Sequence, residues 1–338
     1  MAIAIDNDAA RRLTPRFDEA LEMVLNEFTG LDAARQYHNA FARLLKPDPL
    51  DRVLMMGTDQ RDLFVPVLRT TVASSVPTGG HVLDFGAGDG QTFVLIADAV
   101  PAGTTVSFEE PDAHYVTDYR AMLAGQPHLR PGMALAAGFD EIDAAAQRSG
   151  ADLPADGSID LALALHMIYH LADLPAGLTR MARFLKPGGA LFVVVSDETD
   201  GYTGLALQAF ITAGGDTGDN ALHLAAFAER RRLLGAPKEG GGAILEVLQE
   251  VLPGTGFTLE TVRQPSRLYG HSLADLIALA NIPILAQVDD ITKFESTCRL
   301  LRERPEVVNL RIEDDGPRKG MWSVTEPQII AVLRRERD

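Results

Sequence analysis

Seven short apolar runs, separated by segments with helical spacing, occupy most of the chain from His81 onward and restrict it to one broad class of fold. The runs are HVLDF, TTVSFE, MALAAG, IDLALAL, ALFVVVS, FTLETV and QIIAVLR. Strand-length apolar runs that alternate with helices indicate βαβ units, which assemble into a mostly parallel sheet. We therefore expect an α/β fold whose sheet is covered by helices on both faces.

The first run leads into three glycines at alternate positions, Gly86, Gly88 and Gly90, within VLDFGAGDG. Glycine permits a positive φ and lets a ligand approach the backbone closely. Ligands of open α/β sheets bind at the carboxyl ends of the strands, where these glycines fall. With a helix expected from about Gln91, the loop predicts a nucleotide or nucleoside site; the alternative is a tight turn without a ligand.

The spacing of the glycines distinguishes between possible nucleotides. Dinucleotide-binding loops read G-x-G-x-x-G and place a pyrophosphate at the helix N-terminus, whereas this loop reads G-x-G-x-G. Asp84 and Asp89 would repel a pyrophosphate, but they could hold a cationic ammonium and sulfonium. The loop therefore favours S-adenosylmethionine as cofactor over the NAD of a dehydrogenase.

Two further strand ends supply candidates for binding the rest of this cofactor. Glu110 ends the second run, where a carboxylate can accept both ribose hydroxyls. Glu109 is expected, by strand alternation, to point to the opposite face. After the third run, Phe139 could lie against adenine and Asp140 could accept its amino group; a strand-end turn with solvated acids is the alternative.

Two histidines follow the fourth run, His166 at its end and His170 four residues later, with Tyr169 between them. His166 could contact cofactor and substrate or act as a base, or it could only cap the following turn. Tyr169 could line the methyl site or pack, and a structural role is the more common one for His170. The pair resembles metal ligands on a helix, but a third ligand at recognisable spacing is missing, so no metal is predicted.

The charge of the chain narrows the choice of partners. Its 47 acidic and 31 basic side chains give a formal charge of -16, which disfavours nucleic acid and anionic membrane surfaces. The single cysteine, Cys298, cannot form an intramolecular disulfide, and a secretory signal and a membrane-length apolar segment are not recognisable. A cytoplasmic protein is expected, either alone or as a homo-oligomer.

The chain is expected to divide into two parts. Residues 1–75 have helical spacing and predict an N-terminal helical cap. Residues 76–338 then form the α/β domain, with insertions at about 200–245 and 265–317 that are too long for ordinary connections.

Four motifs, VLDFGAGDG, the Glu110 strand end, IDLALALHMIYHLADL and FLKPGGALFVVVSDE, resemble in order and spacing those of class I S-adenosylmethionine-dependent methyltransferases. The resemblance covers about residues 78–200. It implies a Rossmann-like, doubly wound, seven-stranded sheet of order 3-2-1-4-5-7-6, whose last two strands form an antiparallel pair. It also implies a cofactor over strands 1 and 2 and an acceptor beyond strand 4.

A fainter resemblance is to histamine N-methyltransferase and its relatives, through ARQYHNAFARLL, EEPDAHYVTDYRAML and LHMIYHLADLPAGL. In that family the N-terminal helix supplies aromatic residues to the amine pocket, which implies Tyr37 and Phe41 here. The chain departs from that family in its glycine loop and in having His166 where the family has glutamine. Asp197 and Tyr202, after the fifth strand, are further candidates for contacts with a cationic acceptor; a solvated acidic loop and core packing are the alternatives.

The sequence therefore predicts a methyltransferase that acts on nitrogen or sulfur of a small amine or amino-acid-like acceptor. Methyl transfer from a sulfonium needs orientation and desolvation rather than a nucleophilic side chain. An O-methyltransferase acting on a hydroxyl or carboxylate is an alternative, and so is a protein that binds the cofactor without catalysis.

Overall fold

The computed structural model describes residues 2–51, 53–215, 218–282, 288 and 290–337, with the side chains of 218–221 and 223 left aside. The chain forms two compact units, each built from separate segments. Unit 1 consists of Met1–Asp62, Ser196–Glu229 and Gln264–Gln328, and unit 2 of Leu63–Val195, Arg230–Arg263 and Ile329–Asp338. The N-terminal segment thus shares a unit with most of both insertions, and the expected boundary at residue 75 falls at the end of α4 (Gln60–Ser75).

Unit 2 is built on a seven-stranded sheet with the strand order β4-β3-β2-β5-β6-β11-β7. Renumbered within the sheet, this is the order 3-2-1-4-5-7-6 that the class I resemblance implies, so the predicted fold is confirmed. In sheet order the strands are Arg130–Ala136, Thr105–Glu110, His81–Phe85, Ile159–Leu165, Leu185–Ser196, Gln328–Arg335 and Phe257–Gln264.

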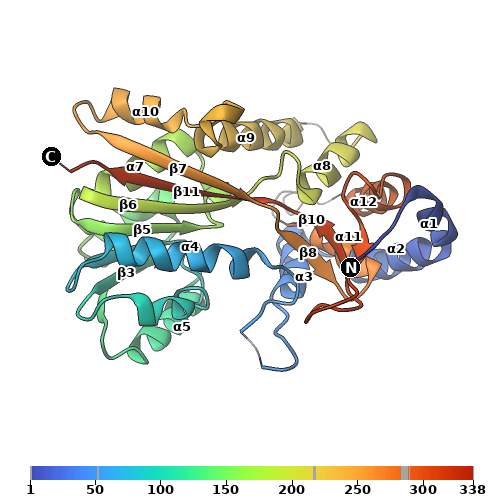
Figure 1. The fold of residues 1–338 in the computed structure, drawn as a ribbon, viewed down its shortest axis with the longest axis horizontal. Coiled ribbons are helices and arrows are strands. Elements are labelled where there is room, and N and C mark those ends of the chain that lie inside the picture. The colour runs from blue at the N-terminus through green and yellow to red at the C-terminus, as the bar shows by residue number, and fades with distance from the viewer. Residues whose placement is uncertain (1, 52, 216–217, 283–287, 289, 338) are drawn as a thin grey trace. The chain divides into compact units, whose positions relative to one another are not determined.

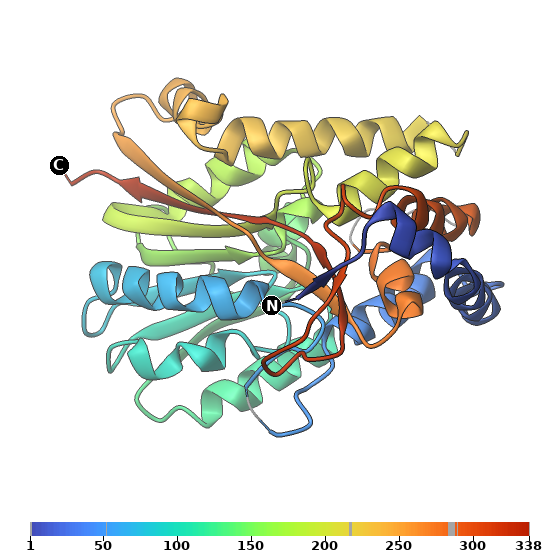
Figure 2. The same cartoon turned by 45° about the vertical axis from the view of Figure 1, so that its right-hand side comes forward.

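The central strands of this sheet run parallel. β2 pairs with β3 and β5, β3 also with β4, and β5 also with β6, all in parallel register. In Figures 1 and 2 the arrow of β11 points the opposite way from those of β5 and β6. The carboxyl ends of β2, β3 and β5 therefore meet at one edge, where the candidate cofactor residues lie.

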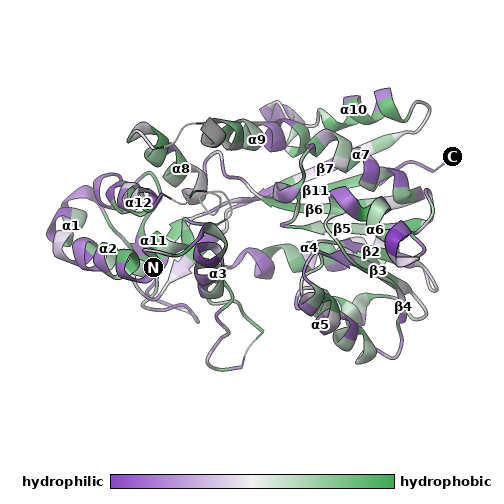
Figure 3. Cartoon of the chain, turned by 180° about the vertical axis from the view of Figure 1, so that it is seen from behind, coloured by the Kyte–Doolittle hydropathy of each residue, from purple (hydrophilic) through white to green (hydrophobic). Residues whose placement is uncertain are grey.

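Alternating residues of the strands enter two separate apolar cores, one on each face of the sheet. Leu83 of β2 packs in one core with side chains of α6 and α7, whereas Val82 packs in the other with side chains of α4 and α5. Both faces are therefore covered, which is why these strands read as continuous apolar runs. Figure 3 shows the hydrophobic colour concentrated on the inner strands.

The helices of unit 2 are mostly those that the alternation predicts. They are α4, α5 (Ala113–Ala124), α6 (Ile142–Ser149), α7 (Leu174–Phe184), the end of α9 (Gly218–Leu234), α10 (Ile244–Val251) and the short turns η1 (Phe93–Leu95), η2 (Ala97–Ala99), η3 (Phe139–Glu141), η4 (Ile168–His170) and η5 (Pro237–Glu239). The α-helix expected from about Gln91 was wrong, because two 3₁₀ turns, η1 and η2, stand there.

Unit 1 combines helices with a small sheet of order β1-β9-β10-β8, antiparallel throughout. The strands in that order are Ile3–Ala4, Arg311–Ile312, Trp322–Thr325 and Arg267–Gly270. The helices are α1 (Asn7–Arg12), α2 (Thr14–Phe28), α3 (Ala33–Leu44), α8 (Tyr202–Thr212), most of α9, α11 (Leu273–Leu279) and α12 (Thr292–Glu303). One apolar core joins buried side chains of α2, α8, α11 and α12.

Candidate functional site

The glycine loop curls at the carboxyl end of β2, and all three of its glycines have positive φ. A Cβ on Gly86 would lie 2.6 Å from the Cβ of Met167, and one on Gly90 would lie 2.8 Å from the Cε of Met122. Those two glycines are therefore required by packing within the protein. A Cβ on Gly88 would meet no described heavy atom within 4 Å, so this position faces open space that a ligand can use.

Two neighbouring glutamates at the end of β3 hold this loop. The Gly88 amide donates to Glu110 Oε2 at 2.9 Å, and the Asp112 amide donates to Glu110 Oε1, also at 2.9 Å. The Gly86 amide lies 3.4 Å from Glu109 Oε2. The expectation that Glu109 points to the face opposite Glu110 stays a prediction. Its carboxyl nevertheless lies beside the loop, since both carboxyls reach loop amides at the strand end.

Asp84 is buried and accepts a hydrogen bond of 2.9 Å from the hydroxyl of Tyr119 on α5. Burial, opposed by this hydrogen bond and reinforced by the charge of Glu110, raises the pKa of Asp84 to about 7. The second aspartate of the loop, Asp89, accepts from the amide and side chain of Gln91. Asp84 therefore links β2 to α5, and its predicted contact with a cationic ligand stays a prediction.

Glu109 is the most deeply buried carboxyl of the loop, with 1% of its surface exposed. Burial raises its pKa to about 8; the Gly86 amide opposes this shift, and the charges of Glu110, Asp84 and Asp140 add to it. Glu109 is therefore mainly protonated at neutral pH, so the loop carries less negative charge than its carboxyl groups alone suggest.

The predicted adenine contacts lie beside the loop. Phe139 is 7% exposed and packs edge-on against Phe85 of β2, with ring centroids 5.0 Å apart. Asp140 Oδ2 accepts from the Ala172 amide at 3.0 Å and so ties η3 to the start of α7. Both side chains thus have structural roles in the protein as described, and their contacts with adenine remain predictions.

His166 directly follows β5 and has a backbone conformation that residues other than glycine rarely adopt, with φ of 53°. Its Nδ1 lies 3.2 Å from the hydroxyl oxygen of Tyr169, and its ring lies 5.9 Å from that of Phe64. The buried Nε2 has no hydrogen-bond partner within the part of the chain that the structure describes. Burial lowers the pKa of His166 to about 4, so the imidazole is neutral at physiological pH.

Backbone strain and an unsatisfied buried nitrogen in one side chain are typical of functional sites. His166 immediately precedes Met167, the residue against which a side chain on Gly86 would collide. The unpaired nitrogen therefore belongs to the segment that packs on the glycine loop. A mere turn-capping role would leave neither feature explained.

Tyr169 is held between His166 and a cation. The guanidinium carbon of Arg230 lies 4.9 Å from the Tyr169 ring centroid, in cation–π geometry. The pKa of His170 is lowered, mainly by desolvation and secondarily by the charge of Arg230. Sequence reasoning missed the contributions of Phe64 and Arg230, because neither lies in a recognisable motif next to His166.

The four residues predicted to contact the acceptor lie in unit 1 and differ in how deeply they are buried. Tyr37 and Phe41 of α3 are half-buried and stacked, with centroids 5.5 Å apart. Asp197 is 3% exposed, so the alternative of a solvated loop at this residue was wrong. Tyr202 is fully buried and donates to the carbonyl oxygen of Leu276 at 2.9 Å, which gives it a packing role; the four acceptor contacts remain predictions.

A buried acid that sequence reasoning missed stands near Asp197 in the same unit. Glu326 accepts from the amide and hydroxyl of Thr203, at 3.0 and 2.6 Å, and so caps the start of α8. Burial raises its pKa to about 7; the two Thr203 hydrogen bonds oppose this shift, and the charge of Asp197 adds to it. Its position between two strands, without a flanking motif, gave no sequence signal for this role.

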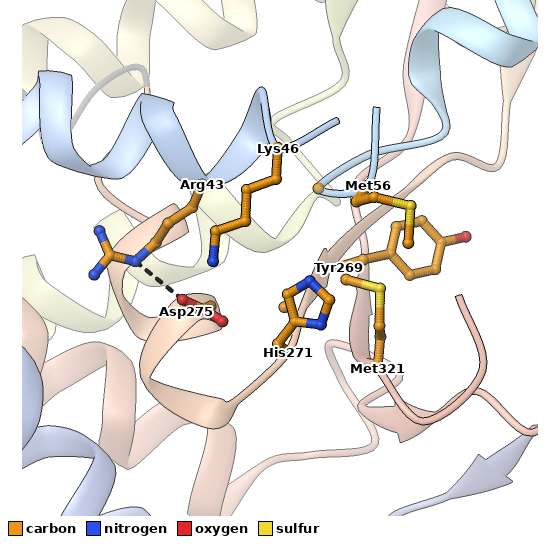
Figure 4. A pocket seen from close by; sticks show the side chains of 9 residues that line it. Arg43, Lys46, Met56, Tyr269, His271, Asp275 and Met321 are labelled. Carbon is orange, nitrogen blue, oxygen red and sulfur yellow. Dashed lines mark hydrogen bonds and ion pairs between the residues drawn. The ribbon is translucent and has the colours of Figure 1, made fainter. Parts of the chain in front are cut away.

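Figure 4 shows the side chains around a small hollow in unit 1, among them Arg43, Lys46, His271 and Asp275. Arg43 forms ion pairs with Asp275 at 3.1 Å and with Glu27 at 2.5 Å. The charge of this arginine is therefore already matched by two carboxylates, and we assign the hollow no ligand.

Among the described residues, no cluster of three or more histidine, cysteine, aspartate or glutamate side chains has a geometry suited to a metal ion. Within the same residues, no helix combines the length and the apolar character needed to cross a bilayer.

Comparison with known proteins identifies a family. A family described as a methyltransferase domain matches residues 32–234, more than half of the chain. The O-methyltransferase cnsE of Penicillium expansum is 33% identical over 132 residues, covering 37% of this chain and 42% of the relative. The O-methyltransferase resE of Aspergillus sclerotiorum is 33% identical over 190 residues, covering 54% of this chain and 56% of the relative.

The chain thus spans about half the length of these curated relatives. Among solved structures, the plantazolicin methyltransferase BamL, in complex with a triazolic desmethylPZN analog and SAH, matches with a TM-score of 0.41 and 10% identity. That match covers 94% of this chain and 100% of the solved one. The fainter resemblance to histamine N-methyltransferase is not shown by any of these comparisons.

Proposed function

Because the chain belongs to the S-adenosylmethionine-dependent methyltransferases, in the family described as a methyltransferase domain, we propose that it methylates a hydroxyl oxygen of a small molecule. The enzyme class and the cofactor agree with the prediction from sequence. The choice of oxygen replaces nitrogen or sulfur as the leading candidate, since both curated relatives are named as O-methyltransferases.

The residues of the glycine loop fit the cofactor. The open space beyond Gly88 would be filled by any side chain, and the two glutamates fix the loop that bounds it. Glu110 still has lone pairs for the ribose hydroxyls, because each carboxylate oxygen accepts more than one hydrogen bond. When bound, S-adenosylmethionine supplies an electrophilic methyl group with a neutral thioether as the leaving group.

One observation carries the proposal: the unpaired Nε2 of neutral His166. A hydroxyl oxygen attacks a methyl carbon more readily as its proton departs, and a neutral imidazole nitrogen can accept that proton. This role requires the tautomer in which Nδ1–H donates to the Tyr169 oxygen, which leaves a lone pair on Nε2. The carbon–sulfur bond breaks as the oxygen–carbon bond forms, and the proton passes from Nε2 to solvent.

The second candidate is transfer to the nitrogen of an amine, which the sequence favoured and which the same histidine could assist. An ammonium must lose its proton before it attacks, so turnover would rise with pH toward the pKa of the amine. Transfer to a thioether sulfur requires no base, and a substitution of His166 would then leave the chemical step almost unchanged.

A panel of phenols, alcohols, carboxylic acids, amines and thioethers, assayed for methylated product, tests the proposal. For a phenol we expect turnover that is lost in H166N and that varies little between pH 6 and 8, because a base of pKa about 4 is already deprotonated there. Turnover of amines only, or of thioethers without dependence on His166, would overturn the assignment to oxygen while keeping the cofactor.

A further inference from the structure

Unit 2 contains a surface groove whose lining residues are not among those of the glycine loop or the His166 segment. It is a groove of about 430 Å³ between α7 and α10, a volume within the range of small-molecule sites. We call it the α7–α10 groove. Its lining consists of Asp173, Pro175, Ala176, Thr179, Arg180, Arg183, Val247 and Val251. The acid among them, Asp173, caps α7 by accepting from the Ala176 amide at 2.9 Å.

Thr179 provides an unmatched hydrogen-bonding group in this groove. The residue is 5% exposed, and its buried Oγ1 has no partner among the described residues. A threonine hydroxyl inside a helix usually donates to a carbonyl oxygen one turn earlier, and this one does not. Because an unpaired buried hydroxyl is costly, this atom suits a ligand that brings its own acceptor.

The opposite wall of the groove is apolar. Val247 and Val251 lie one turn apart on α10, and Val251 keeps 44% of its surface exposed. Ala176 adds a further apolar surface from the first turns of α7. Burying an aliphatic chain here would remove exposed apolar surface from water, which is favourable.

Positive charge lies four residues beyond Thr179 along α7. Arg180 is already engaged, with Asp156 at 2.7 Å, Asp143 at 2.9 Å and the Phe184 ring at 4.2 Å. Arg183 is exposed and makes no ion pair within the described part of the chain. In a chain with 47 acidic side chains, a lining arginine without an acidic partner is notable.

We propose that the α7–α10 groove binds a small carboxylate with an apolar tail. Residues four apart share one face of a helix, so the Arg183 guanidinium can hold the carboxylate on the side of α7 that carries Thr179. The Thr179 hydroxyl, which is buried in the ligand-free protein, then donates to the same carboxylate once its side chain turns toward the groove. The tail then lies between α7 and α10, against Val247 and Val251. The groove is a separate site from the glycine loop, and the proposal does not depend on which acceptor is methylated.

Calorimetric titration with octanoate tests this site. S-adenosylhomocysteine is present throughout, so that the cofactor site is already occupied and octanoate binding there is not measured. We expect octanoate to bind the wild-type protein and to bind at least tenfold more weakly to R183Q and to V251D. The matched control is R148Q, which changes an exposed arginine of α6 that pairs with Glu141 at 3.7 Å, and its affinity should equal that of the wild type.

Thr179→Val separates a binding role from a structural one. Valine has the shape of threonine without the hydroxyl, so we expect T179V to unfold at a higher temperature than the wild type and to bind octanoate more weakly. The proposal is overturned if the wild type does not bind octanoate, if R183Q and R148Q bind it equally, or if neutral octanol binds as well as octanoate.

Discussion

The rings of His166 and Tyr169 lie within 17° of parallel, and the Tyr169 hydroxyl oxygen is 3.2 Å from His166 Nδ1. This contact orients an imidazole whose other nitrogen is unpaired within the described residues. We expect H166N to reduce turnover of a hydroxyl acceptor by about 10²- to 10⁴-fold, as for loss of a general base. Asparagine tolerates positive φ, so H166N should keep the fold and the cofactor affinity.

Y169F separates orientation from proton transfer. It keeps the ring beneath Arg230 but removes the oxygen that faces Nδ1, so turnover should fall less than in H166N. Comparison of kcat and KM for the two variants, with S-adenosylhomocysteine affinity measured in parallel, checks this order. A Y169F enzyme with full activity would show that the contact with Nδ1 is not needed.

Gly88→Ala should abolish cofactor binding at a small cost in stability. Its Cβ would enter the open space beside the loop, and the positive φ of 59° costs about 1–2 kcal/mol for an alanine. Gly79→Ala is the matched control, because its φ is 72° and its Cβ also meets nothing within 4 Å. Calorimetry with S-adenosylhomocysteine should detect binding to G79A and not to G88A. Binding to both variants would show that the glycine loop is a turn without a role in cofactor binding.

Glu110→Gln tests the predicted ribose contact. The variant loses the charge that faces the Gly88 and Asp112 amides and the ribose hydroxyls, so cofactor binding should weaken by about 1.5–3 kcal/mol, or roughly 10- to 150-fold in Kd. Glu109→Gln is the comparison, since its acid is already mainly protonated near neutral pH. If the two variants lost the same amount of cofactor affinity, the predicted contact of Glu110 with the ribose would be contradicted.

The buried acid Glu109 predicts a loss of stability at alkaline pH. Its pKa is about 8 in the folded protein and about 4.3 in the unfolded chain, so the folded state binds more protons between these values and stability falls as pH rises. Glu109→Gln has no proton to lose at this position. The unfolding free energy of the variant minus that of the wild type should therefore increase from pH 5 to pH 9. Denaturant titrations check this, with exposed Glu260→Gln expected to change little at either pH.

The sequence was sufficient for the large sheet because its signals are local. Each strand of unit 2 is an apolar run, and each parallel crossover after the first contains an α-helix, so the order of the runs and the resemblance together predicted the strand order. The small sheet of unit 1 was not predicted. Its strands contain two to four residues and pair across most of the chain, as Ile3 does with Ile312.

The candidate site was predictable in composition but not in geometry. The glycines and Glu110 follow from their positions at strand ends, whereas the contact of Glu109 with the Gly86 amide depends on how the loop turns over the strand. The positive φ of His166, its unpaired nitrogen and the stacking of Arg230 on Tyr169 depend on tertiary packing, which residue spacing does not encode.

The segmented composition of unit 1 has a consequence for synthesis on the ribosome. The strand at its N-terminus, β1, finds its partner β9 only after more than 300 residues have been translated. Helix α2 packs against α11 and α12 in the apolar core, and these two helices are also translated late. The first 62 residues therefore emerge early with their apolar faces uncovered, and their folding must be completed after translation of residue 328. Shortening the chain from its C-terminal end past that point would remove part of this unit, not an accessory tail.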